Sequence, residues 1–307
     1  MKIVIAGGTG FLGRPLSARF AADGHDVVIL TRHTTSDQAP PGTRLATWHP
    51  TGDLGSWADE IDGAAAVVNL AGESIAARRW SDAQKSRILE SRVQATRSLA
   101  AAIRRARTSP SVFISGSAVG YYGPLGDEMV TEDHRPGSDF LARVSVQWEA
   151  EATGGVGSHT RVVCVRTGLV LEKDGGALPQ MLPPFKLGVG GPAGSGRQYW
   201  PWIHRADWVD IIRWTVDTPS VRGPINATGP APVTNTEFAH ALGRTLHRPA
   251  FMPAPAFALR IMLGEMADAL LLSGQRALPA KAERLGYTFL YPRVEDALAA
   301  IFKKSAR

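Results

Sequence analysis

The length, composition and charge of the chain exclude several classes of protein. Its 307 residues include 34 Lys and Arg against 28 Asp and Glu, which gives a formal net charge of +6. Apolar residues make up 44% and charged residues 20%, a globular mix that excludes disorder, collagen and a long coiled coil. The single cysteine, Cys164, excludes an internal disulfide. Because disulfides are typical of oxidising compartments, we expect a cytoplasmic protein.

The sequence gives no sign of a membrane span, a signal peptide or a metal site. It has no uninterrupted apolar run of about 18 residues, the length that a transmembrane helix needs. Met1 leads straight into a short apolar run and a glycine motif, without the pattern of a signal peptide. The eight histidines are scattered and form no cluster typical of metal ligands. We therefore expect no membrane partner and no metal.

The positive charge is concentrated in one segment. Residues 78–107 contain nine basic and two acidic residues, a net charge of +7, whereas the other 277 residues sum to −1. On a helix that turns about 100° per residue, these cations point in several directions and form no stripe. The pattern favours a solvated helix, so we expect no nucleic-acid partner. One alternative functional interpretation is a protein that binds nucleic acid or a membrane surface through this helix.

The N-terminal half alternates short apolar runs with helical patterns. Strands are predicted over 3–6, 27–30, 65–70, 111–115 and 161–166. Helices are predicted from Leu12 to about Asp23, over 81–107 and over 140–152. Continuous Val and Ile strands separated by helices indicate a parallel sheet covered on both faces. The expected fold is therefore α/β, a Rossmann-type doubly wound parallel sheet.

The C-terminal third has a different texture and predicts a smaller α/β lobe. It is rich in Pro and Gly, with five glycines over 188–196, and an apolar helix is expected over 257–272. We assign 1–170 to the Rossmann domain, with its last strand and helix supplied by about 200–228. Residues 171–199 and 229–307 then form a lobe that covers the mouth of the sheet. The segment 188–202 is expected to be a mobile loop in which Gln198 and Trp200 either touch a substrate or pack inside.

A glycine-rich turn follows the first strand and opens the first helix. Its sequence is Gly7-Gly8-Thr9-Gly10-Phe11-Leu12-Gly13. Glycine lets the chain turn tightly and lets the backbone approach a pyrophosphate, while the helix N-terminus offers free N–H groups. We therefore predict a bound dinucleotide that contacts Gly7, Thr9, Gly10, Phe11, Leu12 and Gly13.

The end of the second strand predicts which dinucleotide binds. An acidic residue there would bind the ribose hydroxyl of NAD, but this strand ends in Thr31 and Arg32. Arg32 is placed to meet a 2′-phosphate through charge-assisted hydrogen bonds. We predict NADP(H) in preference to NAD(H), with Thr31 and Arg32 in the binding site. The alternative is that Arg32 is only a solvated loop charge.

Three further stretches resemble the extended short-chain dehydrogenase/reductases. They are Asn69-Leu70-Ala71-Gly72, the run from Ser115 to Gly123, and the run from Trp202 to Val209. A closer resemblance, to the atypical "epimerase family protein" branch, rests on further short motifs. These are the run from Ser117 to Gly123, Ala71-Gly72-Glu73, Ser91-Arg92, Trp148-Glu149 and the run from Lys281 to Tyr287. The resemblance covers essentially the whole chain.

The resemblance implies a place in the site for each motif. The glycines at 7, 10 and 13 would hold the pyrophosphate, and Leu70, Ala71 and Gly72 would lie beside the adenosine side and the ribose. Ser115 and Ser117 would lie under the nicotinamide, with Ser117 matching the catalytic Ser/Thr of the family. Arg166 and the loop after it would close over the nicotinamide end. The C-terminal lobe would shape the substrate pocket.

One departure separates the chain from typical members of that group. They use Tyr-x-x-x-Lys, in which the Lys lowers the pKa of a phenol that is ordinarily near pKa 10. None of the five tyrosines has Lys four residues later. With Trp148-Glu149 as the anchor, the expected pair falls near Leu141 and Ser145. The usual catalytic pair is therefore absent from the sequence.

Two main functional readings follow from this departure. In the first, the protein is an NADP(H)-dependent oxidoreductase or epimerase-like enzyme that acts on an unidentified small substrate. Tyr121 or Tyr122 is then the candidate proton donor near Ser117, unless both rings only pack the loop. In the second, the protein is a catalytically silent NADP(H)-binding regulator, similar to proteins labelled cell-division inhibitors. A monomer or a homodimer is expected.

Overall fold

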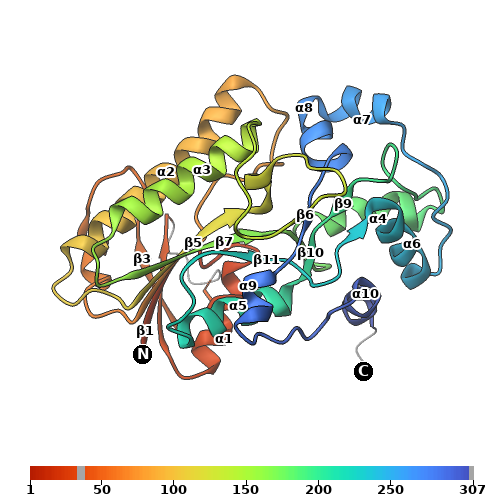
Figure 1. Cartoon of the computed structure of the whole chain (residues 1–307). Helices are drawn as coiled ribbons and strands as arrows, with labels where there is room; N and C mark the ends of the chain where they lie inside the picture. Colours follow the sequence, from red (N-terminus) through yellow and green to blue (C-terminus); the bar gives the residue numbers. More distant parts are fainter. Residues whose placement is uncertain (33–38, 304–307) are drawn as a thin grey trace.

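The computed structural model describes residues 1–32 and 39–303. Seven parallel strands form the main sheet, in the order β11-β7-β5-β4-β1-β2-β3 (Figure 1). Their bounds are Lys2–Ala6 (β1), Asp26–Thr31 (β2), Thr43–Thr47 (β3), Ala66–Asn69 (β4), Val112–Ala118 (β5), Arg161–Thr167 (β7) and Gly223–Ala227 (β11). The predicted Rossmann-type α/β fold is confirmed.

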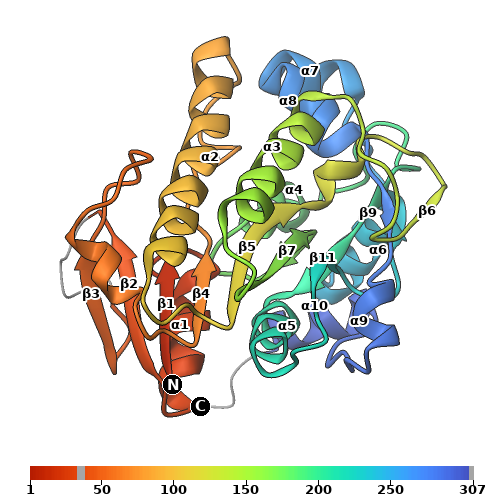
Figure 2. The ribbon, with the colours of Figure 1, turned by 60° about the vertical axis from the view of Figure 1, so that its left-hand side comes forward.

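Helices cover both faces of this sheet because its strands are apolar on both sides. Along β1, Ile3 and Ile5 enter one core, which α1 (Gly13–Ala22) and α5 (Arg205–Asp217) cover. Val4 and Ala6 enter the opposite core, which α2 (Asp82–Arg105) and α3 (Phe140–Gly155) cover. Figure 2 shows α2 and α3 side by side over that face. Cys164 of β7 lies in the second core and is buried.

Side-chain caps fix the starts of the two long helices close to where the sequence predicts them. Ser81 accepts a hydrogen bond from the backbone N–H of Gln84 at the start of α2. Asp139 accepts one from the N–H of Ala142 at the start of α3. Such caps satisfy backbone donors that have no partner within the helix. The two helices are confirmed, and α3 extends three residues beyond its predicted end.

Besides the main sheet, the structure has a separate apolar core, which belongs to the smaller lobe, and three two-stranded sheets. These sheets pair β8 (Leu169–Leu171) with β10 (Trp202–His204), β9 (Tyr199–Trp200) with β12 (Val233–Thr234), and β6 (Met129–Val130) with β13 (Arg276–Ala277). The helices that build this separate core are α4 (Leu178–Lys186), α6 (Asn235–Leu246) and α10 (Val294–Phe302). Helix α9 (Ala280–Arg284) packs against β11, and its Ala282 belongs to the first core of the main sheet. Short helical turns lie over Ser56–Glu60 (η2) and Val119–Tyr122 (η3). Within the described residues, no helix has the length and apolar character to cross a membrane.

Two regions differ from the sequence-based expectations. Strand β3 is not among the predicted strands, because Thr43–Thr47 contains no continuous apolar run. The single helix expected over 257–272 is wrong, because Gly264 adopts a positive φ of 63° and breaks it. The chain there forms α7 (Ala256–Leu263), α8 (Glu265–Ala267) and η4 (Asp268–Leu272).

The loop over 188–202 is anchored by its own side chains. The amide of Gln198 donates hydrogen bonds to the carbonyl oxygens of Ala193 and Leu271, at 2.9 and 2.7 Å. Trp200 and Trp202 are buried in the lobe core. Of the two roles considered for Gln198 and Trp200, internal packing is therefore the one that these contacts favour.

The cations of α2 and its flanks point toward different neighbours. Arg97 pairs with Glu151 of α3, and Lys85 pairs with Glu265 at the start of α8. Arg92 turns inward, donates to the carbonyl oxygen of Glu73 at 2.9 Å, and lies over the ring of Trp148. The excess charge of this segment is therefore distributed over several faces.

His204 and Asp207 join α5 to the segment that leads into α10. The ring Nδ1 of His204 accepts a hydrogen bond from the N–H of Ala206. Asp207 is 1% exposed and accepts the backbone N–H groups of Leu290 and Tyr291, at 2.6 and 3.0 Å. Burial raises the pKa of Asp207, and these two donors act in the opposite direction. The contacts make both side chains structural.

We expect Asp207→Asn to destabilise the fold. An amide has only one acceptor oxygen, so one of the two buried N–H groups loses its partner, at a cost of about 1–3 kcal/mol. Urea unfolding measures this loss, with Asp217→Asn, at the exposed end of the same helix, as the matched control. Equal unfolding midpoints for the two variants would contradict this role of Asp207.

Candidate functional site

The glycine turn after β1 forms a cradle that other residues cannot build. Gly7 has a φ of 76°, in the region that favours glycine. A Cβ on Gly7 would lie 3.0 Å from the carbonyl oxygen of Leu70, and one on Gly13 would lie 2.1 Å from the carbonyl oxygen of Gly7. The N–H of Gly7 also donates to the carbonyl oxygen of Leu30 at 3.3 Å, which ties the turn to the end of β2. The turn therefore brings backbone to the carboxyl edge of the sheet with little side-chain cover.

The N-terminus of α1 opens into this cradle without a cap. Leu12 occupies the N-cap position and provides no side-chain hydrogen bond, and the first turn contains no acidic residue. Within the described part of the chain, the N–H groups of Phe11 and Leu12 donate to no protein acceptor. Free N–H groups and the positive end of the helix dipole suit an anionic group. The cradle thus fits the pyrophosphate of a dinucleotide.

The turn after β4 borders the cradle and is held by Asn69. The side chain of Asn69 is buried, donates to Thr96 at 2.9 Å and accepts from the N–H of Ala71 at 3.1 Å. A Cβ on Gly72 would lie 3.2 Å from the side chain of Arg92. The predicted residues 70–72 therefore lie at the same edge of the sheet as the glycine turn.

Arg32 lies directly after β2 and is exposed. Leu30, two residues before Arg32, is the residue whose carbonyl oxygen accepts from the N–H of Gly7, so Arg32 lies two residues beyond the point where β2 contacts the cradle. Among the described residues, Arg32 forms no ion pair and no hydrogen bond. Its guanidinium is available to an anion from solvent. The residues that follow it, 33–38, lie outside the described part of the chain.

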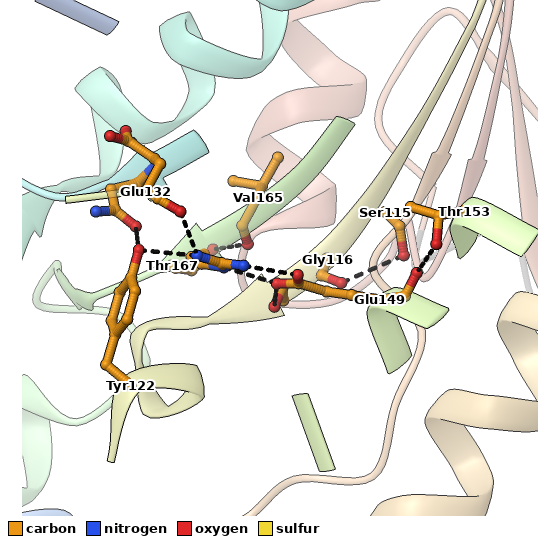
Figure 3. A network of polar contacts seen from close by, with 11 residues as sticks. Ser115, Gly116, Tyr122, Glu132, Glu149, Thr153, Val165 and Thr167 are labelled. Carbon is orange, nitrogen blue, oxygen red and sulfur yellow. Dashed lines mark hydrogen bonds and ion pairs between the residues drawn. The ribbon is translucent and has the colours of Figure 1, made fainter. Parts of the chain in front are cut away.

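A buried ion pair forms the centre of a second cluster, at the ends of β5 and β7. The Nε and Nη2 atoms of Arg166 donate to the two carboxylate oxygens of Glu149, at 2.8 and 2.9 Å. Figure 3 shows Glu149 on one side of this network and Tyr122 and Glu132 on the other. The side chain of Arg166 is 3% exposed and that of Glu149 is 13% exposed. Ser117 donates its hydroxyl hydrogen to the same carboxylate, at 2.6 Å. One carboxylate of α3 therefore connects the ends of two neighbouring strands.

The opposite side of Arg166 extends the network toward the smaller lobe. Its Nη1 donates to the hydroxyl oxygen of Tyr122 and to the carbonyl oxygen of Glu132, each at 3.1 Å. The hydroxyl of Tyr122 donates in turn to Asn226 of β11, at 2.6 Å. The carboxylate of Glu132 accepts the N–H groups of Asn226 and Lys281. The network thereby links the main sheet to the helix α9.

The ring of Tyr121 stacks on the same guanidinium. The distance from its centroid to the Arg166 Cζ is 3.4 Å, and its ring meets that of Tyr122 edge-on. The Tyr121 hydroxyl has no hydrogen-bond partner among the residues that the structure describes. Of the two candidate tyrosines, Tyr121 is therefore the one whose hydroxyl is not engaged inside the network.

Burial and charge set the ionisation of this cluster. Burial raises the pKa of Tyr122 to about 12, although the adjacent Arg166 acts to lower it. Burial alone would lower the pKa of Arg166, but its hydrogen bonds to Glu149 and the nearby Tyr122 outweigh that effect and raise it. Tyr122 therefore stays a neutral phenol and Arg166 a cation at neutral pH.

The structure brings three predicted site residues together. Ser117, Tyr121 and Arg166 share one network. Ser115 is completely buried and donates to the carbonyl oxygen of Gly116, and its predicted contact with a cofactor stays a prediction. The guanidinium of Arg166 is buried among protein partners, and its predicted contact with a cofactor also stays a prediction.

Glu149 is the main residue whose role the sequence does not reveal. It follows Leu141 and Ser145 at intervals of four residues, so all three lie on one face of α3. That spacing is the signal that could have placed Glu149 at the site. Trp148 packs against Gly116 and under Arg92, so motifs that are far apart in the sequence meet in space.

The arrangement restricts what Ser117 can offer to a ligand. An ionised carboxylate accepts hydrogen bonds and donates none, so the hydroxyl hydrogen of Ser117 points to Glu149. The oxygen of Ser117 can then only accept a hydrogen bond from a bound group. The sequence comparison predicts the usual Tyr and Lys near Leu141 and Ser145, and neither of these residues supplies a phenol or an ammonium group. The described residues also contain no cluster that could hold a metal ion.

We expect Glu149→Gln to destabilise the protein strongly, because it leaves the buried Arg166 without a counter-charge. Breaking a buried pair in this way costs about 3–5 kcal/mol. The matched control is Glu151→Gln, two residues later on α3, whose ion pair with Arg97 is exposed and should contribute less than about 1 kcal/mol. Urea unfolding measures the loss in free energy of unfolding for each variant. Similar losses would contradict the larger contribution of the buried pair between Arg166 and Glu149.

Comparison with known proteins yields matches over nearly the whole chain. The model of the NAD dependent epimerase/dehydratase family matches residues 3–227, and a domain of unknown function (DUF1731) matches residues 254–301. Epimerase family protein MT2273 of Mycobacterium tuberculosis is 41% identical over 298 residues, covering 96% of each chain. Epimerase family protein SDR39U1 of Homo sapiens is 36% identical and covers 98% of this chain and 99% of its own.

Solved structures show the same likeness in three dimensions. The crystal structure of human epimerase family protein SDR39U1 (isoform 2) with NADPH has a TM-score of 0.88 at 36% identity, and covers 98% of this chain and 99% of that one. A nucleoside-diphosphate sugar epimerase from Corynebacterium glutamicum has a TM-score of 0.79 at 34% identity, and covers 97% of this chain and 57% of that one.

Proposed function

The chain belongs to the NAD dependent epimerase/dehydratase family, and we propose that it binds NADP(H) and acts on a small substrate as an oxidoreductase or epimerase-like protein. The observation that carries this proposal is the glycine cradle at the uncapped N-terminus of α1. The human relative that was solved with NADPH supports it. A cytoplasmic location and a monomeric or homodimeric state are part of the same proposal.

Different residues of the site are proposed to contact different parts of the cofactor and the substrate. The N–H groups of Phe11 and Leu12, which have no acceptor among the described residues, would receive the pyrophosphate. Gly7, Thr9, Gly10 and Gly13 would line the cradle around it, and the turn over 70–72 would border the adenosine side. A bound nicotinamide would supply or accept a hydride. Ser117 and Tyr121 are the side chains proposed to meet the substrate, with Ser117 as an acceptor held by Glu149. Tyr121 offers the free hydroxyl of the cluster.

The exposed position of Arg32 supports a preference for NADP(H). No acidic residue at the end of β2 competes for a ribose hydroxyl, and the guanidinium has no partner among the described residues. An arginine binds a phosphate through paired, charge-assisted hydrogen bonds. The 2′-phosphate would therefore contribute to the affinity for NADP(H) and be missing for NAD(H).

We expect Arg32→Ala to weaken NADPH binding by about 10- to 100-fold, the loss that corresponds to charge-assisted hydrogen bonds. NADH binding should hardly change, so the preference between the two cofactors should shrink. Calorimetric titration with each cofactor measures both constants. The control is Arg104→Ala, an exposed arginine in the last turn of α2. An unchanged preference in the Arg32 variant would overturn the assignment.

A catalytically silent NADP(H)-binding regulator is the second candidate. It is favoured by the residues that replace the usual pair, Leu141 and Ser145, and by the commitment of the Ser117 hydrogen to Glu149. In this reading, the bound cofactor stabilises one form of the protein that a partner recognises. Both candidates require the same cradle, so only turnover separates them.

Exchange of labelled hydride separates the two candidates. The protein is incubated with deuterated NADPH and a panel of carbonyl compounds and nucleotide sugars, and label transfer is followed by mass spectrometry. An enzyme should transfer label, and Ser117→Ala and Tyr121→Phe should each lower the rate at least about tenfold, as loss of a positioned acid–base group does. Tight NADPH binding with no transfer across the panel would favour the regulator.

A further inference from the structure

Large apolar side chains are exposed along one edge of the smaller lobe. The described residues include twelve exposed large apolar side chains, and seven of them fall in three short stretches of this lobe. The most exposed are Leu187 at 78%, Phe251 at 72% and Ile261 at 71%. The seven residues are Leu187, Val189, Phe251, Met252, Phe257, Ile261 and Met262.

Backbone contacts bring the first two stretches side by side. The N–H of Met252 donates to the carbonyl oxygen of Gly190 at 3.2 Å, and that of Ala254 donates to Pro192 at 2.8 Å. Helix α7 follows directly and has no buried residue. Figure 1 shows the segment between α6 and α7 running along the outer side of the lobe. We call the residues 186–190 and 247–263 the lobe edge.

A cationic groove opens beside the apolar side chains of the lobe edge. It has a volume of about 510 Å³. Its lining residues are His240, Gly243, Arg244, His247, Arg248 and Ala250. Arg248 also donates to the carbonyl oxygen of Lys186, at 3.4 Å, which joins the groove to the first apolar stretch. The hollow part of this surface is therefore basic, while its projecting part is apolar.

The two longer stretches of chain that include the lobe edge contain no acidic residue. Residues 175–204 and 238–264 lack Asp and Glu altogether and contain five Lys and Arg residues. Arg244 and Arg260 pair with acids outside these segments. Lys186, Arg197 and Arg248 form no ion pair with any described residue. The unpaired charges of these two segments are therefore positive. They are separate from the excess positive charge on α2.

We propose that the lobe edge docks the protein on an anionic lipid surface. Apolar side chains that project from a basic surface fit the boundary between lipid headgroups and acyl chains, and free cations are attracted to headgroup phosphates. The groove suits a phosphate group and lacks the apolar lining that a protein helix would need. A second copy of this chain would place like charges against each other. The sequence alone predicts no membrane partner, because it does not show which apolar residues stay exposed.

Vesicle sedimentation tests this proposal on the full chain. Vesicles of phosphatidylcholine alone are compared with vesicles that contain equal parts of phosphatidylcholine and phosphatidylglycerol. The protein should sediment with the anionic vesicles only, and added salt should weaken the binding because it screens surface charge. Phe251→Ser combined with Leu187→Ser, and separately Lys186→Glu combined with Arg248→Glu, should each lower the bound fraction at least about tenfold.

Matched variants elsewhere on the surface complete the test. Met129→Ser removes an exposed apolar side chain outside the lobe edge, and Arg104→Glu reverses a charge on α2. Both should bind vesicles as the unaltered protein does, and unfolding midpoints confirm that every variant is folded. Loss of binding with Arg104→Glu and not with the lobe-edge variants would overturn the proposal. Absence of binding, equal binding to neutral vesicles, or dimers broken by the lobe-edge variants would overturn it as well.

Discussion

The buried ion pair between Arg166 and Glu149 is the interaction on which the candidate catalytic cluster depends. Removing two charges from water is costly, and the pair is held because both carboxylate oxygens are used and the guanidinium also reaches Tyr122 and a backbone carbonyl. The pair joins β7 to α3, and through Tyr122 it reaches β11. Ser117 is oriented by the same carboxylate. A single electrostatic contact therefore positions the side chains of three neighbouring elements.

The two halves of the site rest on different physics. The cofactor half is built from backbone: glycines that let segments approach, and a helix that begins without a cap. The substrate half is built from buried polar side chains, where each change affects a shared network. The glycine turn of the cofactor half is a local sequence motif, and the sequence contains no Tyr-x-x-x-Lys that would belong to the substrate half. The lobe beyond it presents an apolar, basic edge that neither half uses.

The sequence predicts the sheet and the glycine turn well because both depend on local patterns. Apolar runs of Val and Ile identify the central strands, and the place of Gly7 between a strand and a helix identifies the cradle. Contacts across the fold are harder to predict. The inward direction of Arg166, with Glu149 as its partner, follows from packing between β7 and α3. Strand β3 is not an apolar run, because much of it is only partly buried at the sheet edge. The break in the helix at Gly264 depends on the positive φ of this residue, which a pattern of apolar residues does not reveal.

The proposed function depends on the binding of a nicotinamide dinucleotide phosphate to the backbone of the glycine cradle. Amide hydrogen exchange at residues 7–13, measured with and without NADPH, tests it most directly, because the N–H groups of Phe11 and Leu12 have no protein acceptor among the described residues. If NADPH binds there, it should slow exchange at the amides of residues 7–13 and leave exchange in the last turn of α2 unchanged. NADPH binding that leaves the amides of residues 7–13 unprotected would contradict it.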